Sequence, residues 1–302
     1  TKARSNEGTK QRRHEATKAR RHEGKKVCIL VGKLAHPHAL GERCFVLTLG
    51  ICSGKGGTAK TSTTIGLAWS LKDAGLRVLV VDVDPQGHAT TCMGVERQGL
   101  QLTTGEVLMR KVSIADAIVE TPWGIDICPT NERAGEVGAA LEKEYYGHES
   151  LRDALASIED DYDIVLLDCP PSLKSLTASA VYAADWVISP MELSFLSFDR
   201  LVDLQAEAER VCVKAGAPPI SVLVVRYDGR EKVLNELLLK TLADEEAHMM
   251  ETRIPASTKV KQAQSAGMPV QEYAPRSPAS KAFKALAQEI KLVAEGGSRV
   301  AA

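Results

Sequence analysis

Two kinds of hydrophobic pattern alternate along most of the chain. Unbroken aliphatic runs predict buried strands at 44–52, 77–84, 162–172, 186–190 and 220–228. Apolar residues spaced three or four positions apart predict helices at 60–75, 198–216 and 278–294. Strands that are apolar on both faces are typical of a parallel sheet with helices on both sides. The pattern therefore predicts an α/β fold: a doubly wound, mostly parallel sheet flanked by helices, in a single domain over residues 44–302.

The first 43 residues lack this pattern. Three copies of one octad, TKARSNEG, TKQRRHEA and TKARRHEG, fill residues 1–24. None contains an apolar residue larger than alanine, so the octads cannot bury enough surface to offset the entropy of ordering them. We expect a basic, disordered extension over residues 1–43. It is either an arm that contacts a polyanion or a solvated segment without a specific role, and the second interpretation is the simpler.

Composition and charge add three limits. The formal net charge of −1 combines ten basic and three acidic residues in 1–26 with an acidic remainder. The seven cysteines are scattered without a C-x-x-C pair, which argues against a disulfide scaffold and against metal sites built on paired cysteines. No apolar run approaches the ~18 residues of a membrane span. We expect a cytoplasmic protein with free, mostly buried thiols.

Candidate chemistry begins where the first predicted strand ends, in the stretch CSGKGGTAKTS (52–62). It resembles the phosphate-binding pattern G-x-x-x-x-G-K-[ST], in which glycines let backbone N–H groups turn toward phosphate oxygens at a helix N-terminus. Lys60 is expected to pair with the β- and γ-phosphates, and the Thr61 hydroxyl to bind Mg²⁺. The predicted nucleotide-binding residues of the stretch are Gly54, Lys55, Gly56, Gly57, Thr58, Ala59, Lys60, Thr61 and Ser62.

Three carboxylates follow two of the predicted strands. Asp168 ends the run IVLLD, whereas Asp82 and Asp84 end the run that comes directly after the first predicted helix. Because the carboxyl ends of parallel strands meet at one edge of a sheet, these acids are expected to face the glycine-rich loop. Each acid alone is compatible with a helix cap or a solvated turn, but three of them beside such a loop favour a phosphate-bound Mg²⁺ held by Asp168 and Thr61.

Three motifs together resemble one family. KGGTAKT (55–61), DVDPQGHAT (82–90) and DCPPS (168–172) resemble the deviant Walker A ATPases of the ParA/MinD family, most closely the partitioning ParA proteins. The segment 254–290 resembles the C-terminal part of that family, and the likeness extends over most of 44–295. It implies an ATPase that uses ATP and Mg²⁺ and that hydrolyses ATP slowly until a partner stimulates it.

The resemblance also implies roles for single residues. In this family the additional lysine, matched here by Lys55, reaches the phosphates bound by the other subunit, which makes the ATP-bound protein a sandwich homodimer. By the same match, Asp84 positions or activates the attacking water, so Lys55, Lys60 and Asp84 form the expected catalytic set. Asp82 is expected to support the magnesium shell or the adjacent loop. Pro255 is assigned to the nucleotide site.

Ala59 departs from the family pattern, which has glycine at this position. One added methyl group is tolerable if φ of residue 59 stays negative, as we expect near a helix N-terminus. We therefore expect ATP binding to survive, with any effect falling on the rate of hydrolysis. A nucleotide-gated scaffold with negligible hydrolysis stays open as an interpretation.

The family contains members that bind DNA and members that bind membranes. ParA-like proteins bind nonspecific DNA and respond to a ParB-like centromere-binding partner, and the candidate DNA contacts here are Arg226, Arg230, Lys259, Lys261 and Arg276. A MinD-like spatial regulator is the alternative, and it would end in a basic amphipathic helix that lies on a membrane. The last residues, EGGSRVAA (295–302), lack that pattern, so we expect nucleoid association and no membrane binding.

Overall fold

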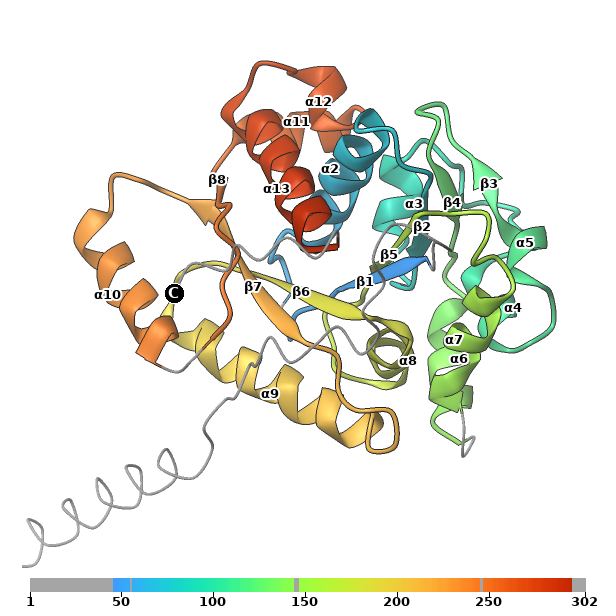
Figure 1. The fold of residues 1–302 in the computed structure, drawn as a ribbon. Helices are drawn as coiled ribbons and strands as arrows, with labels where there is room; N and C mark the ends of the chain where they lie inside the picture. The colour runs from blue at the N-terminus through green and yellow to red at the C-terminus, as the bar shows by residue number, and fades with distance from the viewer. Residues whose placement is uncertain (1–45, 55, 144–146, 245–246, 295–302) are drawn as a thin grey trace, which may run out of the picture.

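The computed structural model describes residues 46–54, 56–143, 147–244 and 247–294. Their strands form one eight-stranded sheet in the order β3-β4-β2-β5-β1-β6-β7-β8 (Figure 1). The pairing of β3 with β4 is antiparallel, and the other pairings between these strands are parallel. The strands are β1 (Leu47–Ile51), β2 (Val78–Asp82), β3 (Val119–Glu120), β4 (Asp126–Cys128), β5 (Ile164–Asp168), β6 (Trp186–Met191), β7 (Ile220–Tyr227) and β8 (Ile254–Pro255). The predicted α/β fold with a mostly parallel sheet is confirmed.

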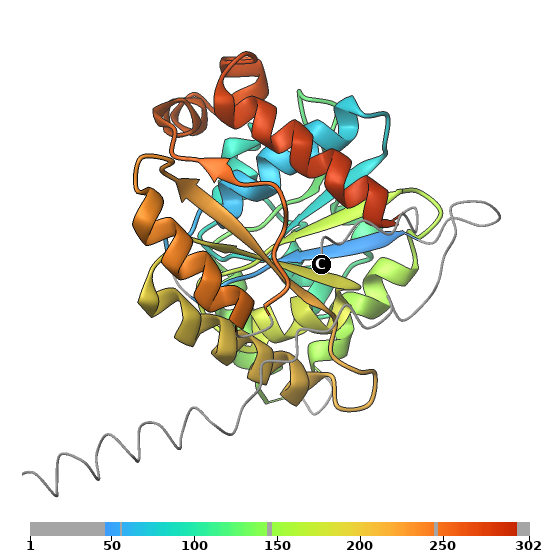
Figure 2. The same ribbon diagram turned by 60° about the vertical axis from the view of Figure 1, so that its left-hand side comes forward.

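Helices cover both faces of this sheet (Figures 1 and 2). They are α2 (Lys60–Asp73), α3 (His88–Cys92), α4 (Thr104–Leu108), α5 (Ile114–Ala117), α6 (Ala134–Leu141), α7 (Ser150–Ala156), α8 (Ser175–Ala183), α9 (Phe195–Val211), α10 (Lys232–Asp244), α11 (Thr258–Ser265), α12 (Val270–Tyr273) and α13 (Pro278–Ala294). A short 3₁₀ turn, Gly147–Glu149, precedes α7. Within the described residues, no helix is long and apolar enough to span a membrane.

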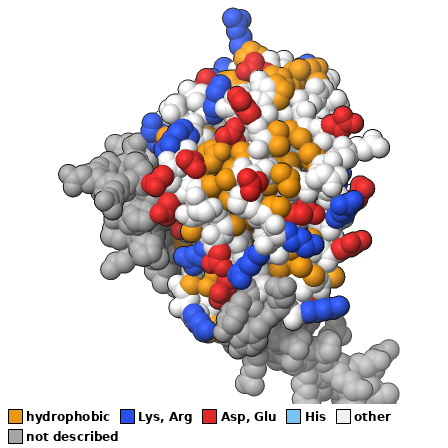
Figure 3. Space-filling view, turned by 90° about the vertical axis from the view of Figure 1, so that its right-hand side faces the viewer, with side chains coloured by type: hydrophobic (Ala, Val, Ile, Leu, Met, Phe, Trp, Pro, Cys, Tyr) orange, Lys and Arg blue, Asp and Glu red, His pale blue; other side chains and the backbone are white. Residues whose placement is uncertain are grey.

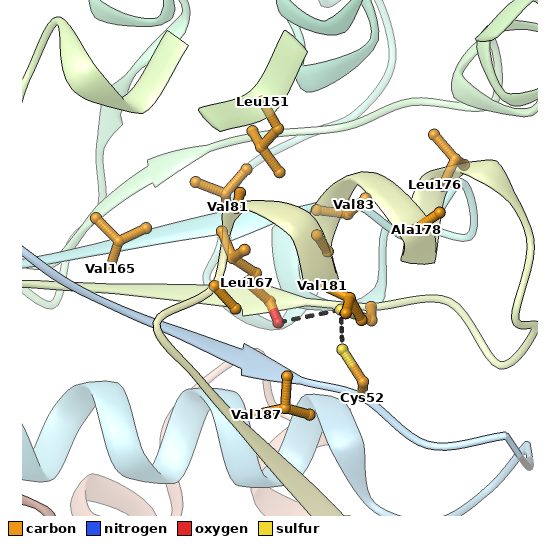
Figure 4. Packing of buried hydrophobic residues seen from close by; sticks show 14 of the residues in the cluster. Cys52, Val81, Val83, Leu151, Val165, Leu167, Leu176, Ala178, Val181 and Val187 are labelled. Atoms are coloured by element: carbon orange, nitrogen blue, oxygen red, sulfur yellow. Dashed lines mark hydrogen bonds between the residues drawn. The ribbon is translucent and has the colours of Figure 1, made fainter. Parts of the chain in front are cut away.

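The continuous apolar runs are explained by two hydrophobic clusters, one on each face. Along β2, Leu79 and Val81 belong to one cluster, whereas Val78 and Val80 belong to the other, because successive side chains of a strand point to opposite faces. Helices α7, α8 and α9 close the first cluster, part of which Figure 4 shows around Leu167. Helices α2 and α13 close the second.

The contact between α2 and α13 is unusually close at one point. The ring of Phe283 lies on the backbone of α2, so that a Cβ atom added to Gly66 would lie 2.6 Å from the ring carbon Cδ2. Gln271 of α12 also contacts α2. Its Nε2 donates to the Gly66 carbonyl at 2.6 Å and to the Ser70 hydroxyl at 2.8 Å. The helix that follows the glycine-rich loop is thus fixed against the C-terminal part of the chain.

Most predicted elements are present, with shifted ends. The helix predicted at 198–216 begins at Phe195 and ends at Val211. The short strands β3, β4 and β8 are absent from the sequence-based prediction, since two or three residues form no hydrophobic run. The expected extension over 1–43 lies outside the described residues, so its disorder and the domain boundary at residue 44 stay predictions.

Candidate nucleotide-binding site

The parallel strands bring the P-loop and the predicted carboxylates to one edge of the sheet. Residues 52–60, called the P-loop here, follow β1 and lead into α2. In the sheet, Asp168 pairs in register with Ile51 of β1 on one side and with Asp82 of β2 on the other. Pro255 ends β8 at the same edge, but β6 and β7 separate β8 from β1. Lys55 lies outside the described residues, and its expected role stays a prediction.

Two of the described P-loop residues have a left-handed backbone conformation. Gly57 has a φ of 76° and Ala59 a φ of 59°. The Ser53 and Thr58 hydroxyl groups form a hydrogen bond of 2.5 Å, which links the start of the loop to its C-terminal part. Neither a side-chain cap nor an acidic residue is present in the first turn of α2. This helix start is therefore compatible with a bound phosphate, which the helix dipole stabilises.

The expected negative φ at Ala59 is wrong. Ala59 is the N-cap of α2 and has a φ of 59° and a ψ of 25°, in the left-handed region that favours glycine. An L-residue in this conformation brings its Cβ close to the following carbonyl oxygen, at a cost of about 1–2 kcal/mol. The alanine thus keeps the backbone shape of the phosphate-binding pattern at a cost in conformational energy.

Two threonine hydroxyls of α2 hold the carboxylate of Asp168. Thr61 donates to Oδ2 at 2.8 Å, and Thr64 donates to Oδ1 at 2.9 Å. Burial raises the pKa of Asp168, while these hydrogen bonds and the charge of the buried Lys60 lower it. Because Mg²⁺ prefers hard oxygen ligands, the adjacent oxygens of Thr61 and Asp168 fit this ion.

The remaining ligands of such an ion would come from phosphate and water. No cluster of three or more His, Cys, Asp or Glu side chains that could hold a metal by itself is found among the described residues. Nucleotide sites usually bind Mg²⁺ through one or two protein oxygens, several waters and the phosphates of the substrate. Thr61 and Asp168 therefore offer as many Mg²⁺ ligands as a protein usually supplies when a nucleotide and water complete the coordination.

Asp82 is fully buried and is bonded to its own loop. Its Oδ2 accepts from the Thr90 amide at 2.8 Å and from the Thr90 hydroxyl at 2.7 Å, and its Oδ1 accepts from the Asp84 amide at 3.2 Å. Burial and the charge of Asp168 raise the pKa of Asp82. These contacts favour support of the loop over direct contact with the metal.

Asp84 begins a compact turn, residues 84–87, that we call the Asp84 turn. Its side-chain Oδ1 accepts from the Gln86 amide at 3.0 Å, and its backbone carbonyl accepts from the Gly87 amide at 2.8 Å. Gly87 then caps α3 with a φ of 60°. The carboxylate, although only 6% exposed, belongs to a turn at the same edge of the sheet as the P-loop.

Two further residues at this site carried no clear signal in the sequence. Thr64, which shares Asp168 with Thr61, was one of several threonines in the KTSTT stretch, and its contact depends on how α2 lies against β5. Arg200 of α9 lies against Gly54, since a Cβ atom added there would be 3.4 Å from its Cδ. Arg200 is distant in sequence from the P-loop, so only the tertiary structure reveals it.

The five candidate DNA contacts fall into two groups. Arg226 and Arg230 form ion pairs with acidic neighbours, namely Glu192 at 2.6 Å and Asp228 at 2.5 Å. In contrast, Lys259, Lys261 and Arg276 are exposed on or beside α11 and α12, and Lys259 lies 5.8 Å from the centre of the Tyr273 ring. The face on the right-hand side of Figure 1 mixes acidic and basic side chains without a continuous basic area (Figure 3).

Comparisons with known proteins identify the family of the chain. The family model described as an AAA domain matches residues 47–215. The chain is 34% identical over 247 residues to the chromosome partitioning protein ParA of Caulobacter vibrioides, which covers 80% of this chain and 92% of ParA. It is 35% identical over 254 residues to the chromosome-partitioning ATPase Soj of Thermus thermophilus, which covers 82% of this chain and 96% of Soj.

Solved structures add the cofactors. Cobyrinic acid a,c-diamide synthase from Mycobacterium smegmatis, with bound ATP analogue and magnesium, is 28% identical with a TM-score of 0.73, and the match covers 83% of this chain and 97% of that chain. The cell division ATPase MinD from Pyrococcus furiosus is 26% identical with a TM-score of 0.65, over 82% of this chain and 99% of that chain. With a P-loop, a Thr61–Asp168 pair that fits Mg²⁺, and these relatives, the chain belongs to the ParA/MinD family of P-loop ATPases, with ATP and Mg²⁺ as its cofactors.

Proposed function

We propose that this protein is an ATP-dependent DNA-partitioning ATPase. The observation that carries the proposal is the extent of the likeness to ParA and Soj, which includes 92% and 96% of their lengths. In the proposed cycle, the ATP-bound protein is a sandwich homodimer that binds DNA without sequence preference in the cytoplasm, on the nucleoid. Hydrolysis, stimulated by a ParB-like centromere-binding protein, then releases it.

The site supports a division of roles in this cycle. ATP would supply the phosphoryl group, and Mg²⁺ held by Thr61 and Asp168 would neutralise the negative charge of its phosphates. Lys60 pairs with the phosphates from within the subunit, and Thr61 and Asp168 hold the magnesium side of the site. Asp84 orients the attacking water. Lys55 of this deviant Walker A loop reaches the nucleotide of the other subunit, which makes dimerisation depend on ATP.

The proposed DNA surface is the exposed basic group on and beside α11 and α12: Lys259, Lys261 and Arg276. These side chains are exposed, so their N–H groups are accessible to the phosphate oxygens of DNA. Arg226 and Arg230 are proposed as secondary contacts, because DNA must compete with Glu192 and Asp228 for their guanidinium groups. Two copies of the surface in a dimer would double the number of phosphate contacts.

An assay of DNA binding in the presence of ATP, ADP or no nucleotide tests the proposal. We expect binding with ATP alone, and a steep loss of affinity as salt rises. The double substitution Lys259→Ala and Lys261→Ala should lower the salt slope by about 1 per lysine. The control Lys240→Ala, an exposed lysine of α10, should leave it unchanged. Equal binding in all three nucleotide states would exclude the proposed cycle.

The homodimer has its own test in Lys55. We expect Lys55→Ala to bind ATP but to stay a monomer, because its own phosphates are held by Lys60 and only the partner's phosphates lose a lysine. Light scattering coupled to size exclusion with ATP measures this. An unchanged ATP-dependent dimer would remove Lys55 from the interface.

A second candidate function is a MinD-like spatial regulator that does not bind DNA. The likeness to MinD favours keeping it, since that match extends over 82% of this chain. Co-sedimentation with anionic liposomes in the presence of ATP separates the two functions. Binding to liposomes without binding to DNA would favour the MinD-like function.

A further inference from the structure

The Asp84 turn is held from outside by one arginine. The guanidinium of Arg97 donates from Nη2 to the Pro85 carbonyl at 2.8 Å and from Nη1 to the Gln86 carbonyl at 2.6 Å. Arg97 lies beyond the end of α3, in the segment that leads to α4. Its planar fork presents two N–H groups in a fixed geometry, and here they meet two consecutive carbonyls of the turn.

The same two peptide groups also contact Asp84. The amide of Gln86 donates to Oδ1 of Asp84 at 3.0 Å, and the amide of Gly87 donates to its backbone carbonyl at 2.8 Å. No cis peptide bond is present among the described residues, so the C=O and N–H of each peptide point in opposite directions. Each peptide therefore lies between the guanidinium of Arg97 on one side and Asp84 on the other.

This arrangement fixes the direction of both amides. If either peptide rotated, its carbonyl would lose a charge-assisted hydrogen bond to Arg97, and its N–H would turn away from Asp84. Hydrogen bonds in such a chain also strengthen one another, because the donor charge polarises the peptide between them. Arg97 thus influences the carboxylate of Asp84 without touching it.

Gly87 provides the space for this contact. A Cβ atom added at position 87 would lie 2.2 Å from Nε of Arg97, and the φ of 60° is itself a conformation that favours glycine. Nε is buried without a hydrogen-bond partner, at a cost in desolvation. The guanidinium occupies this place despite that cost, since its other two donors reach the carbonyls of the turn.

We propose that Arg97 is a positioning residue for ATP hydrolysis, which holds the Asp84 carboxylate in the direction needed to orient the attacking water. The inference rests on the proposed role of Asp84. It assigns to Arg97 an effect on the chemical step and none on the binding of ATP, because its contacts are to the Asp84 turn and not to the P-loop.

Steady-state ATP hydrolysis and single-turnover phosphate release by the full chain test this inference. For Arg97→Met, which keeps an unbranched stem but removes both donors, we expect kcat to fall about tenfold or more, as a displaced catalytic group does. KM for ATP should stay within about twofold, because binding interactions shared by ground state and transition state are untouched. Arg97→Lys should recover part of the rate, since an ammonium group can donate but lacks the planar fork.

Controls separate this inference from the proposed function. Arg210→Met removes an exposed arginine of α9 that pairs with Glu207, and it should leave kcat unchanged. Turnover retained in Asp84→Ala would overturn both the role of Asp84 and the inference. Turnover lost in Asp84→Ala but unchanged in Arg97→Met would overturn the inference alone.

A purely structural role for Arg97 predicts a different result. It would lower the active fraction of protein, so that the number of ATP-binding sites and the amplitude of phosphate release fall together while the rate constant stays the same. That outcome would also overturn the inference. If Arg97→Met does not fold, Arg97→Lys gives the same test, with a reduced rate constant at unchanged KM as the expected result.

Discussion

The P-loop and the Asp84 turn lie at one edge of the sheet but are stabilised in different ways. The P-loop is shaped by its own residues, through the left-handed conformations of Gly57 and Ala59 and the contact between Ser53 and Thr58. The Asp84 turn is shaped from outside, by the Arg97 guanidinium on two of its carbonyls. Loss of Lys60 in the first region should therefore weaken the binding of ATP, whereas changes in the second should alter how fast bound ATP is hydrolysed.

The largest expected effect is in the Asp84 turn. Asp84→Ala removes the group proposed to orient water, so we expect turnover to fall by about 100-fold or more while the Kd for ATP stays nearly constant. Single-turnover phosphate release and equilibrium binding of a fluorescent ATP analogue measure the two quantities. A larger Kd for ATP with normal turnover would contradict the assignment of hydrolysis, and not of ATP binding, to the Asp84 turn.

The complementary change is in the P-loop. Lys60→Met removes a buried ammonium group from the phosphate site, and losing a hydrogen bond to a charged group should raise the Kd for ATP by about tenfold or more. The same binding assay applies, with Arg210→Met as the control for loss of a basic residue elsewhere. Wild-type affinity in Lys60→Met would show that the P-loop does not recognise phosphate through this residue.

The buried pair of Asp82 and Asp168 links the two regions and predicts a pH effect. The pKa values of both carboxyls are raised in the folded protein by burial, so the folded state binds more protons than the unfolded state between the ordinary pKa of aspartate and the raised values. The free energy of unfolding of the nucleotide-free protein should therefore fall as the pH rises from about 4 through the raised pKa values of the two carboxyls.

Thermal unfolding of the nucleotide-free protein from pH 5 to pH 8 measures this effect. Asp82→Asn should flatten the dependence, because the amide cannot ionise, and Mg²⁺ with ATP should flatten it by stabilising the ionised form of Asp168. A melting temperature that rises over this range in the unliganded protein would contradict the prediction.

The smallest expected effect concerns the conformation of Ala59. Ala59→Gly removes the cost of a left-handed alanine but adds freedom to the unfolded chain, so we expect a net gain of about 0.5 kcal/mol in the free energy of unfolding. The matched control is Ala139→Gly in the exposed part of α6, where the same change should cost about 1 kcal/mol. Urea unfolding measures both, and destabilisation by Ala59→Gly would argue against the left-handed conformation.

The P-loop is easier to predict from the sequence than the contacts of the Asp84 turn. The P-loop and the ends of β2 and β5 are predictable because local patterns determine them: glycines and Lys-Thr at a helix start, and aspartates after apolar runs. The contact of Arg97 with the Asp84 turn is not predictable in this way, because nothing in VERQG (95–99) marks that arginine. The φ of Ala59 was predicted wrongly because the shape of the loop outweighs the preference of the residue.

The surface shows the same limit. The family resemblance and the positions of basic residues predict five DNA contacts, but the sequence does not reveal which of these residues form ion pairs within the protein. Arg226 and Arg230 each lie beside a carboxylate, and Glu192 is far from Arg226 in the sequence. The short strand β8 is likewise defined by its pairing with β7 and not by a pattern of its own.

The contact of Phe283 with the backbone of α2 has a consequence for how relatives of this chain can diverge. Any side chain at position 66 would overlap the ring, so a lineage that exchanges Gly66 must first accept a smaller residue at position 283. The two positions are therefore expected to covary, although Gly66 lies in α2 and Phe283 lies in α13. Inherited variation in the last helix is in this way constrained by the helix that begins at the phosphate site.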